Sequence, residues 1–345
     1  MKSRFCILLC LFAALCLGGC EFNFDPRNNA APGVELKLVT NLSRADWSVR
    51  YAAPIGGSIG DIPDIVPSRV SLTVNGTAVP ADSSTIFHNP MLRSGDKVAI
   101  RVDVEGMGTV GGSTTVPEEF KVDTVTFARD EMAGARILTY NVTLDRQPRE
   151  GEYVGIVLYE QDLYLLEGDW QGGGRSVTAR ELKHHSPSTA TSTDLTVEMA
   201  QTFFSGSRMF ESNDSTKSRD ILTMMPASAF KNRKCTLTVL DFSSLMPARQ
   251  GVSLPHPPTQ KPQILDSLKY HYVEVMGISE ELYRYTLSRY KSRSDFLARM
   301  GLAPAQFAWS NVEGGFGVCG AWSWPWMFTF EEKFVTLRDD KQNIK

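Results

Sequence analysis

The chain has 345 residues, with 36 basic and 39 acidic side chains, a formal net charge of −3 and 42% hydrophobic residues. This near-neutral balance excludes a strongly basic nucleic-acid-binding surface and an acidic tail. Apart from a short N-terminal stretch, no segment is apolar enough to span a bilayer, and the length is sufficient for two domains.

The N-terminal stretch is organised like a secretory signal. Lys2 and Arg4 precede an uncharged, mostly apolar run over residues 5–17, and two glycines then lead into Cys20. The run is too short for a membrane-spanning helix but has the length of a signal core. We therefore predict that residues 1–19 are a bacterial lipoprotein signal peptide and that Cys20 carries fatty acyl chains such as palmitate. An ordinary cleaved signal, or an uncleaved anchor, with an incidental cysteine is the alternative.

A polar segment separates this signal from the first regular pattern. Residues 20–33 contain Pro26, Pro32 and Gly33 and no apolar periodicity. Such a composition favours a flexible tether that holds a folded body away from the membrane.

Apolar and polar residues alternate after the tether, as on half-buried strands. The predicted strands that share this alternation cover residues 34–38, 70–79, 98–104 and 120–127. Asn75-Gly76 lies inside the second of them and is the strongest short hairpin signal, because a type I′ turn needs positive φ at both positions. These strands predict an antiparallel β-sandwich domain over residues 34–130.

The second half is again rich in strand patterns and contains one helical pattern. The predicted strands cover residues 137–144, 153–159, 235–240 and 268–276. Ser279 is a candidate N-cap, and Glu280 and Glu281 suit the positive end of a helix dipole. We predict a C-terminal β-rich domain over residues 131–338 with a helix at 280–300. The basic outer face of this helix indicates a solvated surface or, as the alternative, a contact with anionic lipid headgroups.

Cys235 and Cys319 are the cysteines that remain beyond the signal and the lipid site. Outside the cytoplasm a disulfide between them would persist, and it would contribute about 4 kcal/mol in the chain-entropy model. Two buried free thiols, each acting as a small hydrophobic side chain, are the alternative.

Two patterns resemble known sites but lack their context. Gly315, Gly317 and Gly320 match G-x-G-x-x-G, yet no βαβ unit can follow because the chain ends soon afterwards. His184 and His185 follow Glu181, but no third ligand of known spacing is present, and we predict exposed histidines and no metal site.

The remaining polar residues give no catalytic pattern. His271 shares a strand face with apolar residues, which favours a partly buried, hydrogen-bonded histidine. No G-x-S-x-G motif occurs, and no carboxylate pair has a context that would shift its pKa. The sequence therefore predicts a protein that is not an enzyme and uses no cofactor.

Aromatic residues recur at spacing two between residues 322 and 330, so on a strand they would share one face. Pro325 interrupts them and pushes the segment toward a sheet edge or a loop. They form either a core layer or an exposed platform for a sugar, a peptide or a partner protein. We expect at least one exposed indole. The candidate ligand-binding residues are Trp309, Trp322, Trp324 and Trp326.

Two C-terminal segments are similar to conserved-looking segments of a lipoprotein family of the Bacteroidota. Residues 278–288 resemble its serine–tyrosine helix, and residues 309–318, Trp-Ser-Asn-Val-Glu-Gly-Gly-Phe-Gly-Val, resemble its S-N-[IV]-x-x-G-x-G segment. Residues 94–96 and 114–117 resemble its early β module. The family is domain-of-unknown-function family 4249.

This resemblance implies an outer-membrane lipoprotein with immunoglobulin-like β-sandwich modules. Such proteins are often encoded beside TonB-dependent receptors, which suggests an accessory or ligand-capture partner of a transporter. A structural or adhesive surface protein that binds glycan or host protein is the alternative, and a secreted hydrolase is a third reading. The resemblance also implies that acidic residues just after the lipid cysteine favour export to the cell surface. Glu21 and Asp25 follow Cys20 but are not adjacent to each other, so the surface and periplasmic leaflets both stay open.

Overall fold

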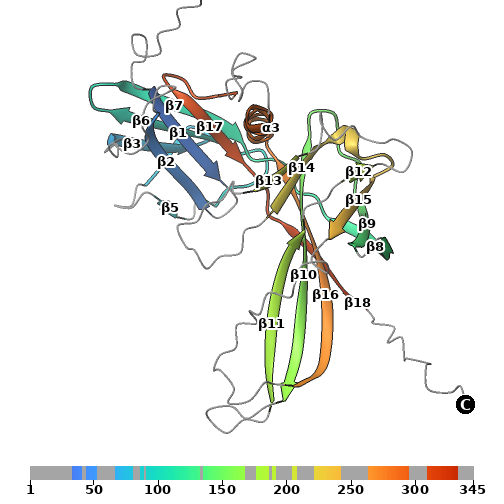
Figure 1. The fold of residues 1–345 in the computed structure, drawn as a ribbon. Coiled ribbons are helices and arrows are strands. Elements are labelled where there is room, and N and C mark those ends of the chain that lie inside the picture. The colour runs from blue at the N-terminus through green and yellow to red at the C-terminus, as the bar shows by residue number, and fades with distance from the viewer. Residues whose placement is uncertain are drawn as a thin grey trace, which may run out of the picture.

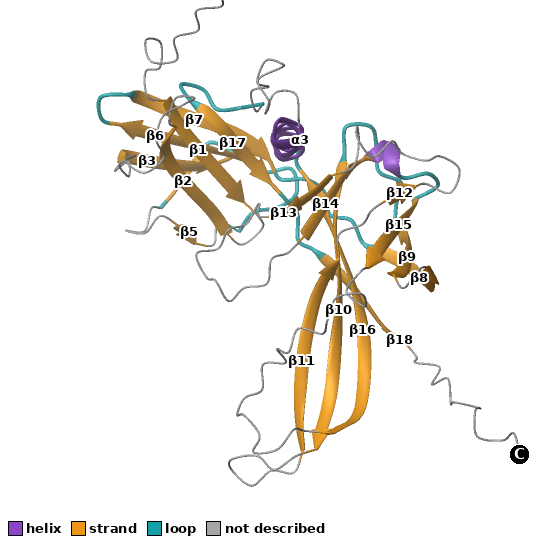
Figure 2. Ribbon diagram, viewed as in Figure 1, coloured by secondary structure: helices purple, strands orange, loops and turns teal. Residues whose placement is uncertain are grey.

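The computed structural model describes most of the chain after residue 32. The described ranges are 33–40, 44–52, 67–80, 86–88, 91–132, 135–167, 176–185, 189–191, 204–207, 221–241, 263–294 and 309–332. They form a mainly β protein, as predicted, with two sandwich modules, one described α-helix and a projecting arm of strands (Figures 1 and 2). The predicted signal peptide, Cys20 and the tether up to residue 32 lie outside the described residues.

The first module consists of two four-stranded sheets. One has the order β17-β1-β2-β5 and the other β4-β3-β6-β7. The strands of the first sheet are β1 (Gly33–Thr40), β2 (Arg44–Ala52), β5 (Ile86–His88) and β17 (Phe316–Ala321). Those of the second sheet are β3 (Pro67–Val74), β4 (Thr77–Val79), β6 (Lys97–Val104) and β7 (Gly108–Thr115). Their inward side chains, such as Leu36, Leu72 and Val102, form one apolar core.

The predicted Asn75-Gly76 hairpin is present between β3 and β4. Asn75 has φ 49° and Gly76 φ 81°, the positive values that this turn requires. The Asn75 side chain also donates to Asp96 Oδ1 at 2.8 Å and accepts from the Lys97 backbone N–H at 2.9 Å. The turn is therefore fixed to the start of β6 as well as to its own strands.

The second module also has two sheets, one of them much longer than the other. The shorter has the order β12-β15-β9-β8, and the longer has β13-β14-β10-β16-β18 with β11 also paired to β10. The shorter sheet contains β8 (Val122–Met132), β9 (Ala135–Leu144), β12 (Thr189–Thr191) and β15 (Lys234–Asp241). The longer contains β10 (Tyr153–Glu167), β11 (Ser176–His185), β13 (Phe204–Ser207), β14 (Ile221–Pro226), β16 (Gln263–Ile278) and β18 (Trp326–Glu332).

The two sheets of this module enclose an apolar core that includes Phe120, Leu138 and Ile156. A 3₁₀ turn, η2 (Ala227–Ala229), follows β14. Strands β10 and β16 have 15 and 16 residues and pair along almost their whole length. They run past the sandwich and, with β11, form the arm that points away from it (Figure 1).

The last part of the chain returns to the first module. β17 pairs in parallel with β1, with Leu38 opposite Cys319, and the chain then crosses to β18 in the second module. In addition, β8 pairs with β9 of the second module rather than with a strand of the first module. The contiguous division into residues 34–130 and 131–338 therefore does not describe the arrangement. Strand patterns locate strands, but they carry no information about which distant strand is the partner.

The single described helix, α3 (Glu280–Ser294), starts where the sequence predicted. Ser279 Oγ accepts the backbone N–H of Leu282 at 3.3 Å, which is the expected N-cap bond. The same oxygen accepts the N–H of Ala321 at 3.1 Å, so the cap also ties the helix to β17. The predicted residues 295–300 lie outside the described part of the chain.

The rejected G-x-G-x-x-G match has a packing explanation. Gly317 has φ 126°, and a Cβ there would lie 1.9 Å from the carbonyl oxygen of Leu36 in β1. A Cβ at Gly320 would lie 2.8 Å from the Leu282 side chain of α3. These glycines let β17 lie close to β1 on one side and to α3 on another.

Cys235 and Cys319 are both free and buried, so the hypothesis of a disulfide between them is wrong. Cys235 belongs to the core of the second module and Cys319 to the core of the first. Burial raises the pKa of each thiol to about 12, which keeps both protonated and unreactive at neutral pH.

Gly317→Ala tests the close approach of β17 to β1. The added Cβ meets backbone rather than a movable side chain, and φ is unfavourable, so we expect a loss of at least about 2 kcal/mol in the free energy of unfolding. Gly108→Ala is the matched control, because Gly108 has φ 88° but open space around its Cβ position. Urea unfolding should show a clearly larger loss for Gly317→Ala, and equal losses would contradict the packing role.

Candidate functional site

The four candidate tryptophans are divided between two environments. Trp309 and Trp322 are partly buried and pack against the cluster that includes Leu282 and Tyr283 of α3. The backbone N–H of Trp309 donates to Ser288 Oγ at 2.8 Å, and that of Trp322 donates to the carbonyl oxygen of Thr40 at 3.0 Å. These two residues help to seat the helix and do not form one site with the other two.

Trp324 and Trp326 are exposed, with 54% and 43% of their surface accessible, and the neighbouring Met327 is 54% exposed. At least one exposed indole was predicted, and that expectation is confirmed. We call Trp324 and Trp326 the tryptophan ridge; Met327 follows Trp326 directly in β18 and therefore faces the opposite side of the strand. Lys121 Nζ lies 5.3 Å from the centre of the Trp326 ring, within the range of a cation–π contact.

The ridge is held at both ends. Just before it, the buried Ser323 donates its backbone N–H to the carbonyl oxygen of Gly277 at 2.9 Å, and its hydroxyl accepts the Gly277 N–H at 2.8 Å. At its other end, Trp326 lies opposite Val275 in the pairing of β18 with β16. The exposed indoles are therefore presented by a fixed backbone at the crossing between the modules.

A buried ionic cluster that was not predicted from the sequence lies in the second module at the base of the arm. Its members share a location between the two sheets and come from five strands: Arg136 of β9, Glu160 and Asp162 of β10, His185 of β11, Asp241 of β15 and Lys269 of β16. Glu160 is at its centre and only 1% exposed.

The contacts of Glu160 join both sheets. Arg136 Nη2 lies 3.0 Å and Lys269 Nζ 3.3 Å from Glu160 Oε1. His185 Nε2 lies 3.3 Å from Glu160 Oε2, without the alignment of a hydrogen bond. The predicted exposed histidine at position 185 is therefore wrong, since His185 is buried beside a carboxylate.

The remaining contacts complete the cluster. Arg136 also pairs with Asp241, to which its Nε donates at 2.8 Å, and Lys269 Nζ lies 2.5 Å from Asp162 Oδ1. Three carboxylates thus surround one arginine, one lysine and one histidine. Leaving any one of these charges without its partners would be costly, because removing one member of a buried pair destabilises by about 3–5 kcal/mol.

The cluster shifts the pKa values of its members. Burial alone would raise the pKa of Glu160, but the three basic side chains around it outweigh burial and hold that pKa well below its usual range. Burial likewise opposes the charge on Arg136, yet its two carboxylate partners raise its pKa above the ordinary value. The expectation that no carboxylate has a perturbing context is therefore wrong.

His271 is buried and hydrogen-bonded, as predicted. Its Nδ1 lies 2.9 Å from the hydroxyl of Tyr140, and its Nε2 lies 3.0 Å from Glu332 Oε2. Arg129 Nη1 lies 3.3 Å from the other oxygen of Glu332, which links β8 to β18 across the open side of the sandwich. Burial opposes the charge on Glu332, but His271 and Arg129 outweigh it and lower the pKa of this carboxyl.

One sequence signal could have revealed the ionic cluster. Val154, Ile156 and Leu158 of β10 are buried, and Glu160 and Asp162 continue the same alternation toward the same face. A charge at an inward strand position needs a partner, and β16 repeats the pattern with Lys269 two residues before His271. The identities of the partners could not be derived, because they come from distant strands.

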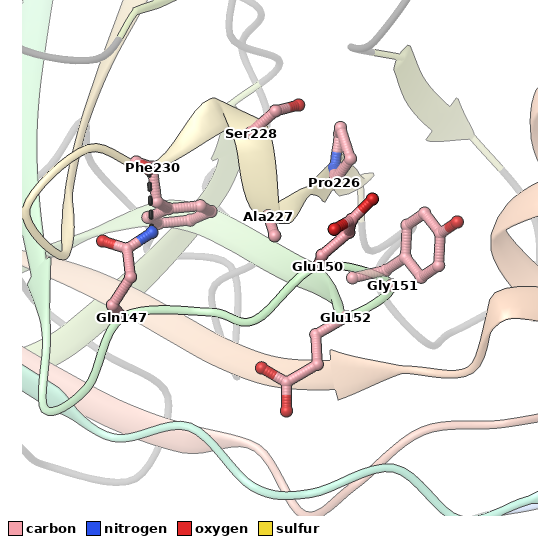
Figure 3. A pocket seen from close by; sticks show the side chains of 9 residues that line it. Gln147, Glu150, Gly151, Glu152, Pro226, Ala227, Ser228 and Phe230 are labelled. Atoms are coloured by element: carbon pink, nitrogen blue, oxygen red, sulfur yellow. Dashed lines mark hydrogen bonds between the residues drawn. The ribbon is translucent and has the colours of Figure 1, made fainter.

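The structure also contains an open pocket of about 530 Å³ beside the turn that leads into β10 (Figure 3). Its walls include Glu150, Tyr153 and the segment from Pro226 to Phe230. Among the described residues, no group of three or more His, Cys, Asp or Glu side chains is arranged to hold a metal ion. No described helix is long and apolar enough to cross a membrane.

Glu160→Gln tests the ionic cluster. At pH 7 the substitution leaves Arg136 and Lys269 with one carboxylate fewer, and we expect a loss of about 3–5 kcal/mol in the free energy of unfolding. Because the folded pKa of Glu160 is lowered, its contribution is fully present above the unfolded value of about 4.3 and declines as pH falls below it.

The wild-type advantage over Glu160→Gln should therefore shrink between pH 5 and pH 3 in urea unfolding. Glu331→Gln, at an exposed carboxylate of β18, is the control and should change stability by no more than about 0.5 kcal/mol. A Glu160→Gln variant as stable as the control at pH 7 would refute the role of the cluster.

Comparison with known proteins identifies a family. The sequence profile of the family described as a domain of unknown function (DUF4249) matches residues 38–325, which span β1 to the start of the tryptophan ridge. A comparison with curated proteins finds no match.

Proposed function

The chain belongs to the family described as a domain of unknown function (DUF4249), and on this premise we propose that it is a non-enzymatic outer-membrane lipoprotein. In this proposal it serves as an accessory or ligand-capture partner of a TonB-dependent transporter. Cys20 carries the lipid anchor, and the β-sandwich body acts through contacts with other molecules.

The tryptophan ridge is the observation that supports a binding role most strongly. Its two exposed indoles lie two residues apart in the chain, whereas exposed apolar residues on soluble proteins are usually scattered singly. Tryptophan is enriched at the centres of protein interfaces, where burial of its area supplies much of the binding energy. The fixed backbone around Ser323 also reduces the entropy lost on binding.

The polar groups buried in the second module support a scaffold rather than a reaction centre. Glu160 and its partners join the two sheets, and His271 is held between Tyr140 and Glu332 inside the core. Because Glu160, Lys269 and His271 are at most 5% exposed, a substrate has little direct access to them. Their arrangement fits a protein that positions its arm and ridge for a partner.

Cys20→Ala tests the anchor. The N-terminal segment up to Cys20 has the organisation of a lipoprotein signal. We expect the variant to move from the membrane fraction to the soluble fraction and to lose the mass of the acyl chains. Retention in the membrane together with an unchanged mass would refute lipidation.

Trp324→Ala tests the ridge. Since Trp324 is half exposed, we expect the free energy of unfolding to stay within about 0.5 kcal/mol of wild type. Recovery of an outer-membrane receptor, when the lipidated protein is purified from its native membrane in mild detergent, should fall sharply because an aromatic anchor is lost.

Met91→Ala is the matched control, because Met91 is 74% exposed and lies in the first module away from the ridge. It should leave receptor recovery unchanged. If the wild-type protein recovers no receptor, the transporter proposal is contradicted. If Trp324→Ala and the wild type recover equal amounts of receptor, the ridge is not the surface that contacts the receptor.

A further inference from the structure

The open pocket beside β10 is preformed. One wall is the turn of residues 147–153, and the other is the segment from Pro226 to Phe230. The Ala227 N–H donates to the carbonyl oxygen of Glu152 at 3.0 Å, and Gln147 Nε2 donates to the carbonyl oxygen of Phe230 at 2.9 Å. Because both walls are tied together by these bonds, the pocket does not depend on a ligand for its shape. We call it the turn pocket.

The basic side chains of the same turn are directed to other carboxylates. Arg146 pairs with both oxygens of Glu152, at 2.7 and 3.0 Å, and the Arg149 N–H also donates to Glu152 at 2.6 Å. The Arg149 guanidinium lies 3.5 Å from Glu118. These contacts satisfy Glu152 and leave both arginines outside the lining of the pocket.

Two glutamates line the turn pocket, Glu150 and Glu152, and Glu150 is the one that Arg146 and Arg149 do not contact. It is exposed and lines the turn pocket, and it makes no ion pair with any other described residue. Figure 3 shows its carboxylate beside Pro226, whereas the side chain of Glu152 points away from Pro226. No lysine or arginine is among the described residues that line the pocket, so the local charge of its lining is negative.

The other lining groups suit the carbon chain of a cationic ligand. Tyr153 contributes a ring that is held in place by stacking on Tyr283 of α3, with centroids 4.2 Å apart. Pro226 adds apolar surface, and the exposed Ser228 adds a hydroxyl. A short aliphatic stem can lie along such a wall while its charged end reaches a carboxylate.

We infer that the turn pocket binds a guanidinium or ammonium group carried on a short aliphatic chain. The group donates charge-assisted hydrogen bonds to Glu150, and the stem packs against Tyr153 and Pro226. The chemistry is that of an arginine or lysine side chain of a protein, or of a small free amine. The inference rests on the charge and shape of the pocket and is independent of the transporter proposal.

A ligand-detected NMR titration of the full-length protein in mild detergent tests this site. The probe is N-acetyl-arginine amide, and N-acetyl-citrulline amide is an uncharged control of the same shape. We expect saturable binding of the arginine probe and at least about tenfold weaker binding of the citrulline probe, since a charged hydrogen bond is lost. Binding of the arginine probe should weaken with added salt.

Two variants locate the binding. Glu150→Gln should weaken binding of the arginine probe by about tenfold or more. Glu331→Gln, at an exposed carboxylate elsewhere, should leave the affinity unchanged. Agmatine, which lacks the backbone amides, distinguishes the sources: tighter binding of agmatine indicates a small amine, and tighter binding of the blocked residue indicates a protein side chain. Absence of saturable binding, equal binding of the arginine and citrulline probes, or an unaffected Glu150→Gln variant overturns the inference.

Discussion

The parallel pairing of β17 with β1 is the constraint on which the rest of the structure depends. It places Cys319 and Ala321, from near the end of the described chain, in the core of the first module. Asn311 fixes the returning strand, because its side chain accepts the Cys319 N–H and donates to the Cys319 carbonyl, each at 2.9 Å, and donates to the Ser113 carbonyl at 3.0 Å. The first module is therefore complete only after nearly all residues of the second module have been synthesised.

The returning strand also fixes how the modules meet. Ser279 caps α3 and holds β17 with the same oxygen, and the helix then contacts both modules. Tyr285 donates to Glu35 of β1 at 3.2 Å, while Tyr283 stacks on Tyr153 of β10. Burial raises the pKa of both tyrosines to about 12, so they remain neutral donors at physiological pH. The crossing that carries the tryptophan ridge is thus held by the helix and by two sheets.

Local elements were predictable because their signals are local. The Asn75-Gly76 turn, the alternation along β6 and the cap at Ser279 each depend on neighbouring residues, and each is present. The pairing of β17 with β1 and the assignment of β8 to the second module were not predictable, because both depend on contacts between residues far apart in sequence.

The candidate site was predictable to a similar degree. Spacing and Pro325 indicated an aromatic segment at an edge, and exposure of Trp324 and Trp326 agrees with that. Spacing could not separate these residues from Trp309 and Trp322, which pack beneath α3, since the separation depends on where the chain crosses between modules. The partners of Glu160 were likewise not predictable, because they lie on three other strands.

We propose that the tryptophan ridge contacts a protein partner at the membrane. The most direct measurement places a photo-crosslinking amino acid at position 324, with position 91 as the reference, and identifies the products after irradiation of native membranes. The account predicts a crosslink from position 324, absent from position 91, to an outer-membrane receptor. Crosslinks only to lipid, or identical products from both positions, would contradict it.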